Sequence, residues 1–300
     1  MLVEKIVNQI KMKFPPDRNW KYQKQTDPPS FGWANLVSGE VLTGEVNKRR
    51  DKCRAILEHG EQYCDFEKGK VSMVVLSCKR WWTLKRLLES INPFFKEIED
   101  YSLLEKILVD NASGDDLINN VKSYDFFDSL VCHENNLGMV GALKDIFGKV
   151  DGEYILFCED DFVLEYDQPF IQKCINLFDQ YPEIGIIRLK NQNNWWKPFR
   201  KIAPERTNKD GTSFWPWIPS KDRKKNVWCA GSVMFRRVSY FATGPLPDIP
   251  HVTRTAKFDH ATVYEYEYGI KYNENWLAAK IKNCSPFVQP NDNEQSPGWK

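Results

Sequence analysis

Three adjacent acids, Glu159, Asp160 and Asp161, interrupt an apolar stretch of the sequence, YILFCEDDFVLE at 154–165. Like charges side by side repel one another, and a buried carboxylate is costly without a cation or a hydrogen-bond donor. Carboxylate oxygens are also ligands that Mg²⁺ and Mn²⁺ prefer, and a bound diphosphate commonly supplies further oxygens. The cluster therefore indicates a site for a divalent cation together with a diphosphate.

The segments that must position these acids alternate between strand and helix patterns from Val71 onward. The strand-like runs are VSMVVLSC, LEKILVDNASGDD, SLVCHENN and GEYILFCEDD, and helical spacing appears in KRWWTLKRLLESI and LGMVGALKDIFGKV. Continuous apolar strands joined by helices are typical of a parallel sheet that is covered on both faces. We therefore expect an α/β fold with a mostly parallel, Rossmann-like sheet flanked by helices.

Polar residues follow each of the predicted strands. The residues at these ends are Ser77 and Arg80, Asp110 and Asn111, Asn135 and Asn136, and the three acids. Ligands of parallel sheets bind beyond the carboxyl ends of the strands, so these side chains are expected to share one site. The sequence has no G-x-G-x-x-G after the first strand and no G-x-x-x-x-G-K-[ST] motif, so the usual glycine cradles for phosphate are not indicated.

The composition argues against several partners and compartments. A net charge of +1 removes the bulk electrostatic argument for binding nucleic acid. The 8 cysteines form no C-x-x-C pair, which argues against structural zinc and favours a reducing, cytoplasmic compartment. No signal peptide or membrane-spanning run is visible. Residues 1–14 have an apolar helical face, which predicts either packing on the main domain or a peripheral contact with a membrane's cytoplasmic face.

Together these motifs resemble a glycosyltransferase of the GT-A fold, similar to family 2, with EDD as a variant of the acid-x-acid metal motif. The segments that carry the resemblance are VVLSCKR at 74–80, ILVDNASGDD at 107–116, HENNLGMVGAL at 133–143, YILFCEDDFVLE at 154–165 and WCAGSVMFRR at 228–237. The resemblance implies one GT-A domain at 70–300, with a nucleotide-sugar half at 70–165 and an acceptor half at 166–300. Residues 1–69 carry none of it and are expected to form a helical and irregular extension.

The resemblance also implies roles for the strand-end residues. Asp161 would ligate Mn²⁺ or Mg²⁺ directly, and Asp160 would contact the donor ribose or, through water, the metal. Asp110 would accept a hydrogen bond from the base or ribose, and Arg80 would lie against the base or the phosphates. The rest of the implied donor-binding set is Ser77, Asn111 and Lys144. Two structural alternatives stay open, in which Asp110 caps a turn and Arg80 is a solvated helix start.

A transfer with inversion needs a general base for the acceptor hydroxyl, on the face opposite the leaving diphosphate. In inverting relatives an E-D-x-E-L-G stretch opens the helix that carries the base. VYEYEYGIKY at 263–272 resembles it with Glu265 at the base and Glu267 at the following acid, although Tyr replaces the first acid and Glu replaces Asp. An alternating strand is the structural alternative, and Asp259 and His260 are reserve candidates for the base.

Two further features bear on the metal and the acceptor. Gln289 stands where relatives often carry a metal-binding His, which implies fewer protein ligands for the cation or a weaker dependence on metal. Trp215 and Trp217, in SFWPWIP, are candidate platforms for an acceptor sugar, because an indole combines an apolar face with a polar rim. Packing of these rings in the core is the alternative.

The sequence therefore predicts an enzyme that transfers a hexose-type sugar from a nucleoside diphosphate to a hydroxyl of a glycan or lipid-linked acceptor. UDP is favoured as the donor nucleotide, with GDP as the alternative, and inversion is favoured over retention. Two rival functions are a sugar nucleotidyltransferase and a non-catalytic sugar- or nucleotide-binding module. The first would need a glycine-rich stretch that SCKRWW lacks, and the intact acid cluster speaks against the second.

Overall fold

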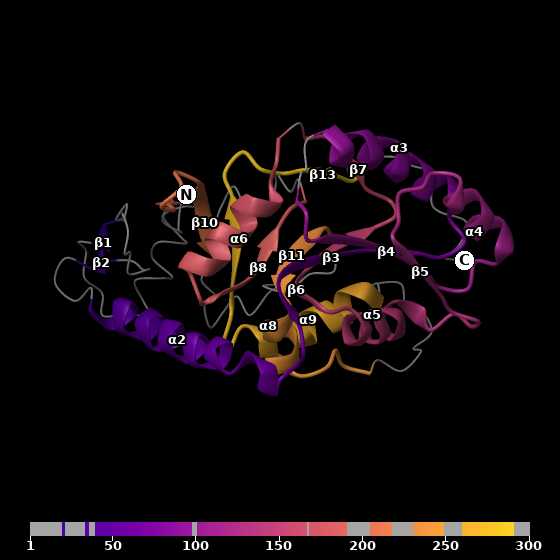
Figure 1. The fold of residues 1–300 in the computed structure, drawn as a ribbon. Helices are drawn as coiled ribbons and strands as arrows, with labels where there is room; N and C mark the ends of the chain where they lie inside the picture. The colour runs from indigo at the N-terminus through magenta and orange to yellow at the C-terminus, as the bar shows by residue number, and fades with distance from the viewer. Residues whose placement is uncertain are drawn as a thin grey trace, which may run out of the picture.

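The computed structural model describes residues 20–21, 34–35, 40–97, 101–166, 168–190, 205–217, 228, 231–248 and 260–290. They form a mixed α/β structure around a nine-stranded sheet with the strand order β5-β4-β3-β6-β11-β8-β12-β10-β9 (Figure 1). The predicted fold class, a mostly parallel sheet flanked by helices, is confirmed.

The strands of the large sheet are β3 (Glu67–Ser77), β4 (Leu104–Asp110), β5 (Ser129–Cys132), β6 (Gly152–Glu159), β8 (Ile184–Arg188), β9 (Arg206–Thr207), β10 (Ser213–Trp217), β11 (Val233–Arg236) and β12 (Leu277–Ile281). Two small sheets pair β1 (Trp20–Lys21) with β2 (Ala34–Asn35), and β7 (Val163–Leu164) with β13 (Phe287–Val288). The helices are α2 (Glu40–Glu58), the 3₁₀ turn η1 (Gly60–Gln62), α3 (Trp81–Glu97), α4 (Asp115–Lys122), α5 (Gly138–Lys149), α6 (Ile171–Gln180), α8 (Arg237–Thr243) and α9 (His260–Tyr272).

The four strands predicted from the sequence are β3, β4, β5 and β6, and they are parallel to one another. β11 runs antiparallel to both of its neighbours, β6 and β8. The register places Val233, the first residue of β11, level with Phe157 of β6 and Arg188 of β8. The carboxyl ends of β6 and β8 therefore meet the amino end of β11 at one edge of the sheet.

Both faces of the sheet are covered by helices, as Figure 1 shows. Successive residues of a strand point to opposite faces, and the buried residues of β3 follow this rule. Met73 and Val75 belong to a core that also includes residues of α3 and α6, whereas Val74 and Leu76 belong to a second core with residues of α5, α8 and α9. A strand buried on both faces needs apolar residues at every position, which explains the continuous apolar run of β3.

Helix α2 packs on the sheet domain through buried polar contacts. The guanidinium of Arg50 donates to both carboxylate oxygens of Glu183, at 2.7 and 3.0 Å, and the Glu183 side chain is fully buried. Cys53 donates to the carbonyl of Asn275 at 3.0 Å, just before β12. Residues 40–58, within the expected extension, therefore contact the domain directly.

Among the described helices, none is long and apolar enough to cross a membrane. The expected helix at 1–14, with its proposed membrane contact, lies outside the described residues. The seven described cysteines are free thiols, and four of them, Cys53, Cys158, Cys174 and Cys284, are buried as small apolar residues.

Candidate active site

The predicted strand-end residues meet at one edge of the parallel sheet. The register pairs Ser77 with Asp110 across β3 and β4, and Leu76 with Glu159 across β3 and β6. Asp110 is in turn level with Cys132 at the end of β5. The carboxyl ends of these strands therefore bring Ser77, Asp110 and the acid cluster together, as the sequence predicted.

Asp160 is the buried centre of this group. Its Oδ2 accepts a hydrogen bond of 2.7 Å from the Ser77 hydroxyl, and its Oδ1 is paired with the guanidinium of Arg80. The Asp160 side chain is 0% exposed. Burial raises the pKa of Asp160 to about 7, although Arg80 and Ser77 act to lower it. Because both of its oxygens already have partners, Asp160 serves in this structure to hold Arg80 and Ser77 in position.

Asp161 differs from its neighbour in both exposure and hydrogen bonding. Its side chain is 25% exposed, and its Oδ2 accepts a 2.8 Å hydrogen bond from Nε2 of Gln289. The same Oδ2 lies 3.9 Å from a guanidinium nitrogen of Arg80. Its Oδ1 is buried and has no hydrogen-bond partner within the described part of the chain. A buried carboxylate oxygen without a donor is costly, so this atom is the one best suited to a bound cation.

These residues fit a cation that is held partly by its substrate. No group of three or more His, Cys, Asp or Glu side chains among the described residues could hold a metal ion alone. Mg²⁺, however, is commonly bound through one or two carboxylates and substrate phosphates rather than by a complete protein cage. Oδ1 of Asp161, which has no partner among the residues that the structure describes, matches that arrangement.

Glu159 links the acid cluster to the later half of the chain. Burial raises its pKa well above the ordinary value, and the charges of Asp161 and Glu265 raise it further. The ammonium of Lys190 acts in the opposite direction on the same group. Glu265 and Lys190 therefore lie close enough to the acids to share their electrostatic environment.

The segment that carries Glu265 is a helix, so the alternative of an alternating strand is wrong. Tyr264, Tyr268 and Tyr272 are all buried, and their spacing of four residues marks the inner face of α9. On this helix Glu265 is partly buried, whereas Glu267 is exposed. Asp259 lies outside the described residues, and the side chain of His260 is likewise not described.

Asp110 and Asn111 organise the turn after β4. The carboxylate of Asp110 accepts hydrogen bonds from the backbone N–H of Ser113, the nearer at 3.0 Å, so the turn-capping alternative is present in the structure. Asn111 is buried, and its side-chain oxygen accepts from the N–H of Leu137 at 2.9 Å. Asn111 thereby ties this turn to the start of α5.

The described contacts of Lys144 and Trp215 are with residues outside the acid cluster. Lys144 is on α5 and donates to Asp248, which follows α8. It lies six residues past Gly138, which is about 9 Å along a helix. Trp215 is only 7% exposed and has the ammonium of Lys282 at 6.0 Å from its ring centre, an arrangement that favours the packing alternative. The side chain of Trp217 is outside the described residues.

Lys190 is a site residue that was not predicted from the sequence. It lies two residues past the end of β8, at the same edge where Asp110 ends β4, and β8 begins with the apolar residues IGII. The rule used for the other strands, that polar residues after a buried strand border the site, applies to it equally. Its ammonium donates to Oε1 of Gln289 at 2.8 Å, so it is connected to Asp161 through that amide.

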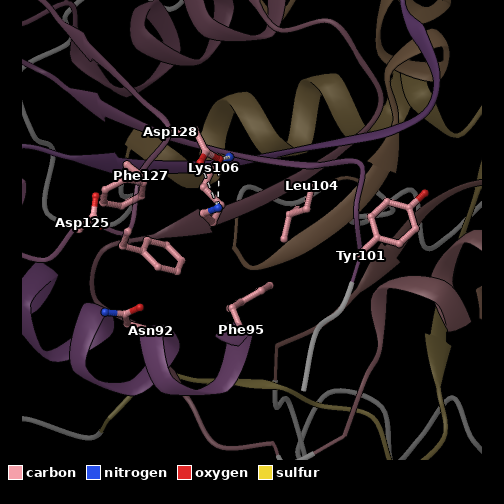
Figure 2. Close-up of a pocket in the computed structure, with 9 residues that line it drawn as sticks. Asn92, Phe95, Tyr101, Leu104, Lys106, Asp125, Phe127 and Asp128 are labelled. Carbon is pink, nitrogen blue, oxygen red and sulfur yellow. Dashed lines mark hydrogen bonds and ion pairs between the residues drawn. The ribbon is translucent and has the colours of Figure 1, made fainter. Parts of the chain in front are cut away.

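A separate cavity lies at the other end of the strands (Figure 2). Its volume is about 340 Å³, and it is lined by Asn92, Phe95, Tyr101, Leu104, Lys106, Asp125, Phe126, Phe127 and Asp128. Figure 2 shows the ion pair between Lys106 and Asp128, with 3.1 Å between Nζ and Oδ1. Since Leu104 opens β4 and Asp110 closes it, this cavity is separated from the acids by the length of that strand, about 20 Å.

The fold is shared with solved glycosyltransferases. S. aureus TarS 1–349 in complex with UDP-GlcNAc has a TM-score of 0.53 and 15% identity, over 75% of this chain and 60% of that chain. The mannosyltransferase PcManGT from Pyrobaculum calidifontis, in complex with GDP-Man and Mn²⁺, has a TM-score of 0.52 and 12% identity, over 85% and 69% of the two chains. This chain spans only 36% of the longer TarS chain. No curated protein matches the sequence significantly.

A parallel sheet with an acid cluster at its carboxyl edge, in this shared architecture, is the GT-A fold. The model of the family described as glycosyl transferase family 2 matches residues 72–240, more than half of the chain. The chain belongs to glycosyl transferase family 2, and it is a glycosyltransferase enzyme.

Proposed function

We propose that this enzyme transfers a hexose-type sugar from a nucleoside-diphosphate donor to a hydroxyl of a glycan or lipid-linked acceptor, with inversion at the anomeric carbon. The observation that carries the proposal is the buried Oδ1 of Asp161, which has no hydrogen-bond partner among the described residues and lies at the edge where β3, β4 and β6 end. Ligands bind at this edge in parallel sheets, and a carboxylate oxygen without a donor suits a cation that bridges to a diphosphate.

The cation and the nucleoside of the donor are assigned to residues before 166, and the acceptor to residues after it. Asp161 would hold Mn²⁺ or Mg²⁺, which when bound would stabilise the leaving diphosphate as a Lewis acid. Asp160 holds Arg80 in place for contact with the phosphates or the base. Ser77, Asp110 and Asn111 would shape the pocket for the nucleoside, with UDP favoured over GDP.

The acceptor side supplies the base. Glu265 would take the proton of the acceptor hydroxyl as that oxygen forms its bond to the anomeric carbon. The bond from the anomeric carbon to the diphosphate oxygen breaks, and its electron pair leaves with the nucleoside diphosphate. The partly buried position of Glu265 and its electrostatic effect on Glu159 support this role better than the exposed position of Glu267 does.

The ligands bound in two solved structures of the same fold suggest which donors to test. The TarS complex contains UDP-GlcNAc, and the PcManGT complex contains GDP-Man and Mn²⁺. Both proteins share the fold at low identity, so they support a nucleotide-sugar donor without selecting one. A screen should therefore include UDP-linked and GDP-linked sugars, each with Mn²⁺ and with Mg²⁺.

The decisive assay measures release of nucleoside diphosphate from these donors by the full chain, with and without glycan acceptors. We expect release from at least one donor, a rise when a matching acceptor is added, and loss of release in EDTA. Asp161→Asn is the matched control and should be inactive under the same conditions. Failure of the wild-type chain to release UDP or GDP from any donor, with any acceptor, would refute the proposal.

A further inference from the structure

The backbone of Lys190 is held rigidly at the edge of the candidate active site. Its carbonyl accepts a 3.1 Å hydrogen bond from Nζ of Lys280, which is itself buried and also donates to the carbonyl of Cys284. An isolated parallel bridge pairs Lys190 with Phe287. Two independent contacts therefore fix where the side chain of Lys190 begins, which is the condition for a preorganised binding group.

The ammonium group of Lys190 is directed toward the acid cluster by neutral neighbours. It lies 4.8 Å from the ring centre of Phe162 and donates to Oε1 of Gln289 at 2.8 Å. The same amide of Gln289 donates to Oδ2 of Asp161. Lys190 is therefore one side chain away from the carboxylate that we assign to the cation.

Lys190 is not engaged as a counter-ion. Among the described residues it has no carboxylate within ion-pair distance, even though it lowers the pKa of Glu159 by its charge. A lysine ammonium has three N–H donors, and contacts within the described chain use one of them. Arg80 is by contrast already paired with Asp160. Within the described part of the chain, Lys190 therefore has donors left for a ligand, whereas Arg80 is committed to Asp160.

We propose that Lys190 binds the diphosphate of the sugar donor and stabilises it as the leaving group, beside the cation at Asp161. The inference rests on the proposed function and adds a specific phosphate ligand to it. An ammonium is a compact point charge suited to phosphate oxygens, and its effect grows as the bridging oxygen gains negative charge. Hydrogen bonding alone accounts for this role, because the nucleoside diphosphate leaves without needing a proton from Lys190.

The test measures affinities by calorimetry for UDP and GDP, and for the matching nucleosides uridine and guanosine, in Mn²⁺ and again in EDTA. Lys190→Met removes the charge and keeps much of the apolar stem, whereas Lys190→Arg keeps the charge. Lys173→Met is the matched control, because Lys173 also lies over an aromatic ring, Tyr166 at 6.0 Å, and beside a glutamine oxygen, that of Gln168 at 3.5 Å. Circular dichroism checks that each variant is folded.

We expect Lys190→Met to weaken binding of the nucleoside diphosphate by about 10- to 100-fold, as befits a lost hydrogen bond to a charged group. The loss should appear in Mn²⁺ and in EDTA, and nucleoside affinity should not change. Lys190→Arg should retain most of the affinity, and Lys173→Met all of it. Should Lys190→Met unfold, Lys190→Gln replaces it with the same expectation.

The outcomes separate this inference from the proposed function. If the wild type binds UDP or GDP and Lys190→Met binds it equally well, the inference is wrong and the proposed function stands. An equal loss for nucleoside and nucleoside diphosphate, or a loss seen only in Mn²⁺, would also overturn it, since Lys190 would then act on the pocket or on the cation. If the wild-type chain binds no nucleoside diphosphate, both proposals fail.

Discussion

The hydroxyl of Ser77 and the carboxylate of Asp160 lie 2.7 Å apart, joining the ends of two neighbouring parallel strands. The bond is buried, and the other oxygen of Asp160 is occupied by Arg80. The adjacent carboxylate, Asp161, keeps an oxygen without a partner in the described chain. The roles are therefore divided between two consecutive aspartates. Asp160 holds Ser77 and Arg80 in place, and Asp161 has an oxygen available to a cation.

This division predicts opposite phenotypes for the two aspartates. Asp161→Asn should abolish transfer and Mn²⁺-dependent binding of nucleoside diphosphate while the melting temperature stays close to that of the wild type, because a carboxylate ligand is lost and no buried pair is broken. Asp160→Asn should instead lower the stability by about 1–3 kcal/mol, because Asn offers only one acceptor oxygen to Ser77 and Arg80, and Arg80 then keeps only its longer, 3.9 Å contact with Asp161. Calorimetry with Mn²⁺ and thermal melts measure both effects. Near wild-type turnover in Asp161→Asn would show that the metal assignment is wrong.

Asp110→Ala should weaken binding of the sugar donor and of the free nucleoside diphosphate to the same extent. The predicted contact is to the base or ribose, which interacts equally in the ground state and the transition state. Since Asp110 also caps the N–H of Ser113, Asp110→Asn is the control that keeps an acceptor for the turn. Unchanged affinity combined with a reduced rate in Asp110→Ala would contradict the nucleoside role.

Glu265→Gln should lower the rate of transfer by roughly 10²–10⁴-fold while donor binding survives, because the substitution keeps the size and removes the basic oxygen. A base must be deprotonated to act, so the wild-type rate should fall as the pH is lowered, and this acidic limb should disappear in the variant. Glu267→Gln should be much milder, in keeping with its exposed position on α9.

The pair of glutamates also defines how this prediction can fail. If Glu267→Gln is inactive and Glu265→Gln is nearly normal, the assignment along α9 is wrong. If both variants are active, the base lies elsewhere, with Asp259 next to test, or the enzyme retains configuration. Product stereochemistry, read from the anomeric proton by NMR, separates these last two cases.

Glu183→Ala should destabilise the protein by about 3 kcal/mol or more, because it leaves the guanidinium of Arg50 without its buried partner. Arg54→Ala is the matched control on the same helix, since its pair with Asp51 is exposed on both sides and should contribute little. Denaturant unfolding of the two variants measures the difference. Equal stability would mean that α2 is held by other contacts.

The strands and helices could be predicted from the sequence because the pattern that indicates each of them lies within one short segment. The strands β3, β4 and β6 each contain a run of apolar residues, VVL, ILV and YILFC respectively, and the helices between them have regular spacing. α9 shows the limit of local patterns, because YEYEY fits both an alternating strand and a helix. The burial of Tyr264, Tyr268 and Tyr272 at intervals of four settles it, and that burial depends on the partners packed against the helix.

The acids at the strand ends could be predicted from the sequence. The contacts between residues that lie far apart in the sequence could not. Ser77 and Asp110 are the last residues of buried strands, so a general rule about parallel sheets finds them. The contact between Lys190 and Gln289 joins residues that are 99 positions apart, and that between Arg50 and Glu183 spans 133 positions. No periodicity or motif encodes such pairs, because they exist only once the chain has brought distant elements together.

The reversed direction of β11 has a consequence for how such an enzyme could diversify. Since β11 runs against β6 and β8, the segment that precedes it, rather than the one that follows, arrives at the active edge. The links from β3 to α3, from β4 to α4 and from β5 to α5 are all short, so insertions there would disturb the donor side that we propose. Length changes ahead of β11 would instead alter the border of the proposed acceptor side and leave these strands in place. New acceptor preferences should therefore arise most readily through insertion, deletion or grafting in that segment, which makes it the natural region for engineering.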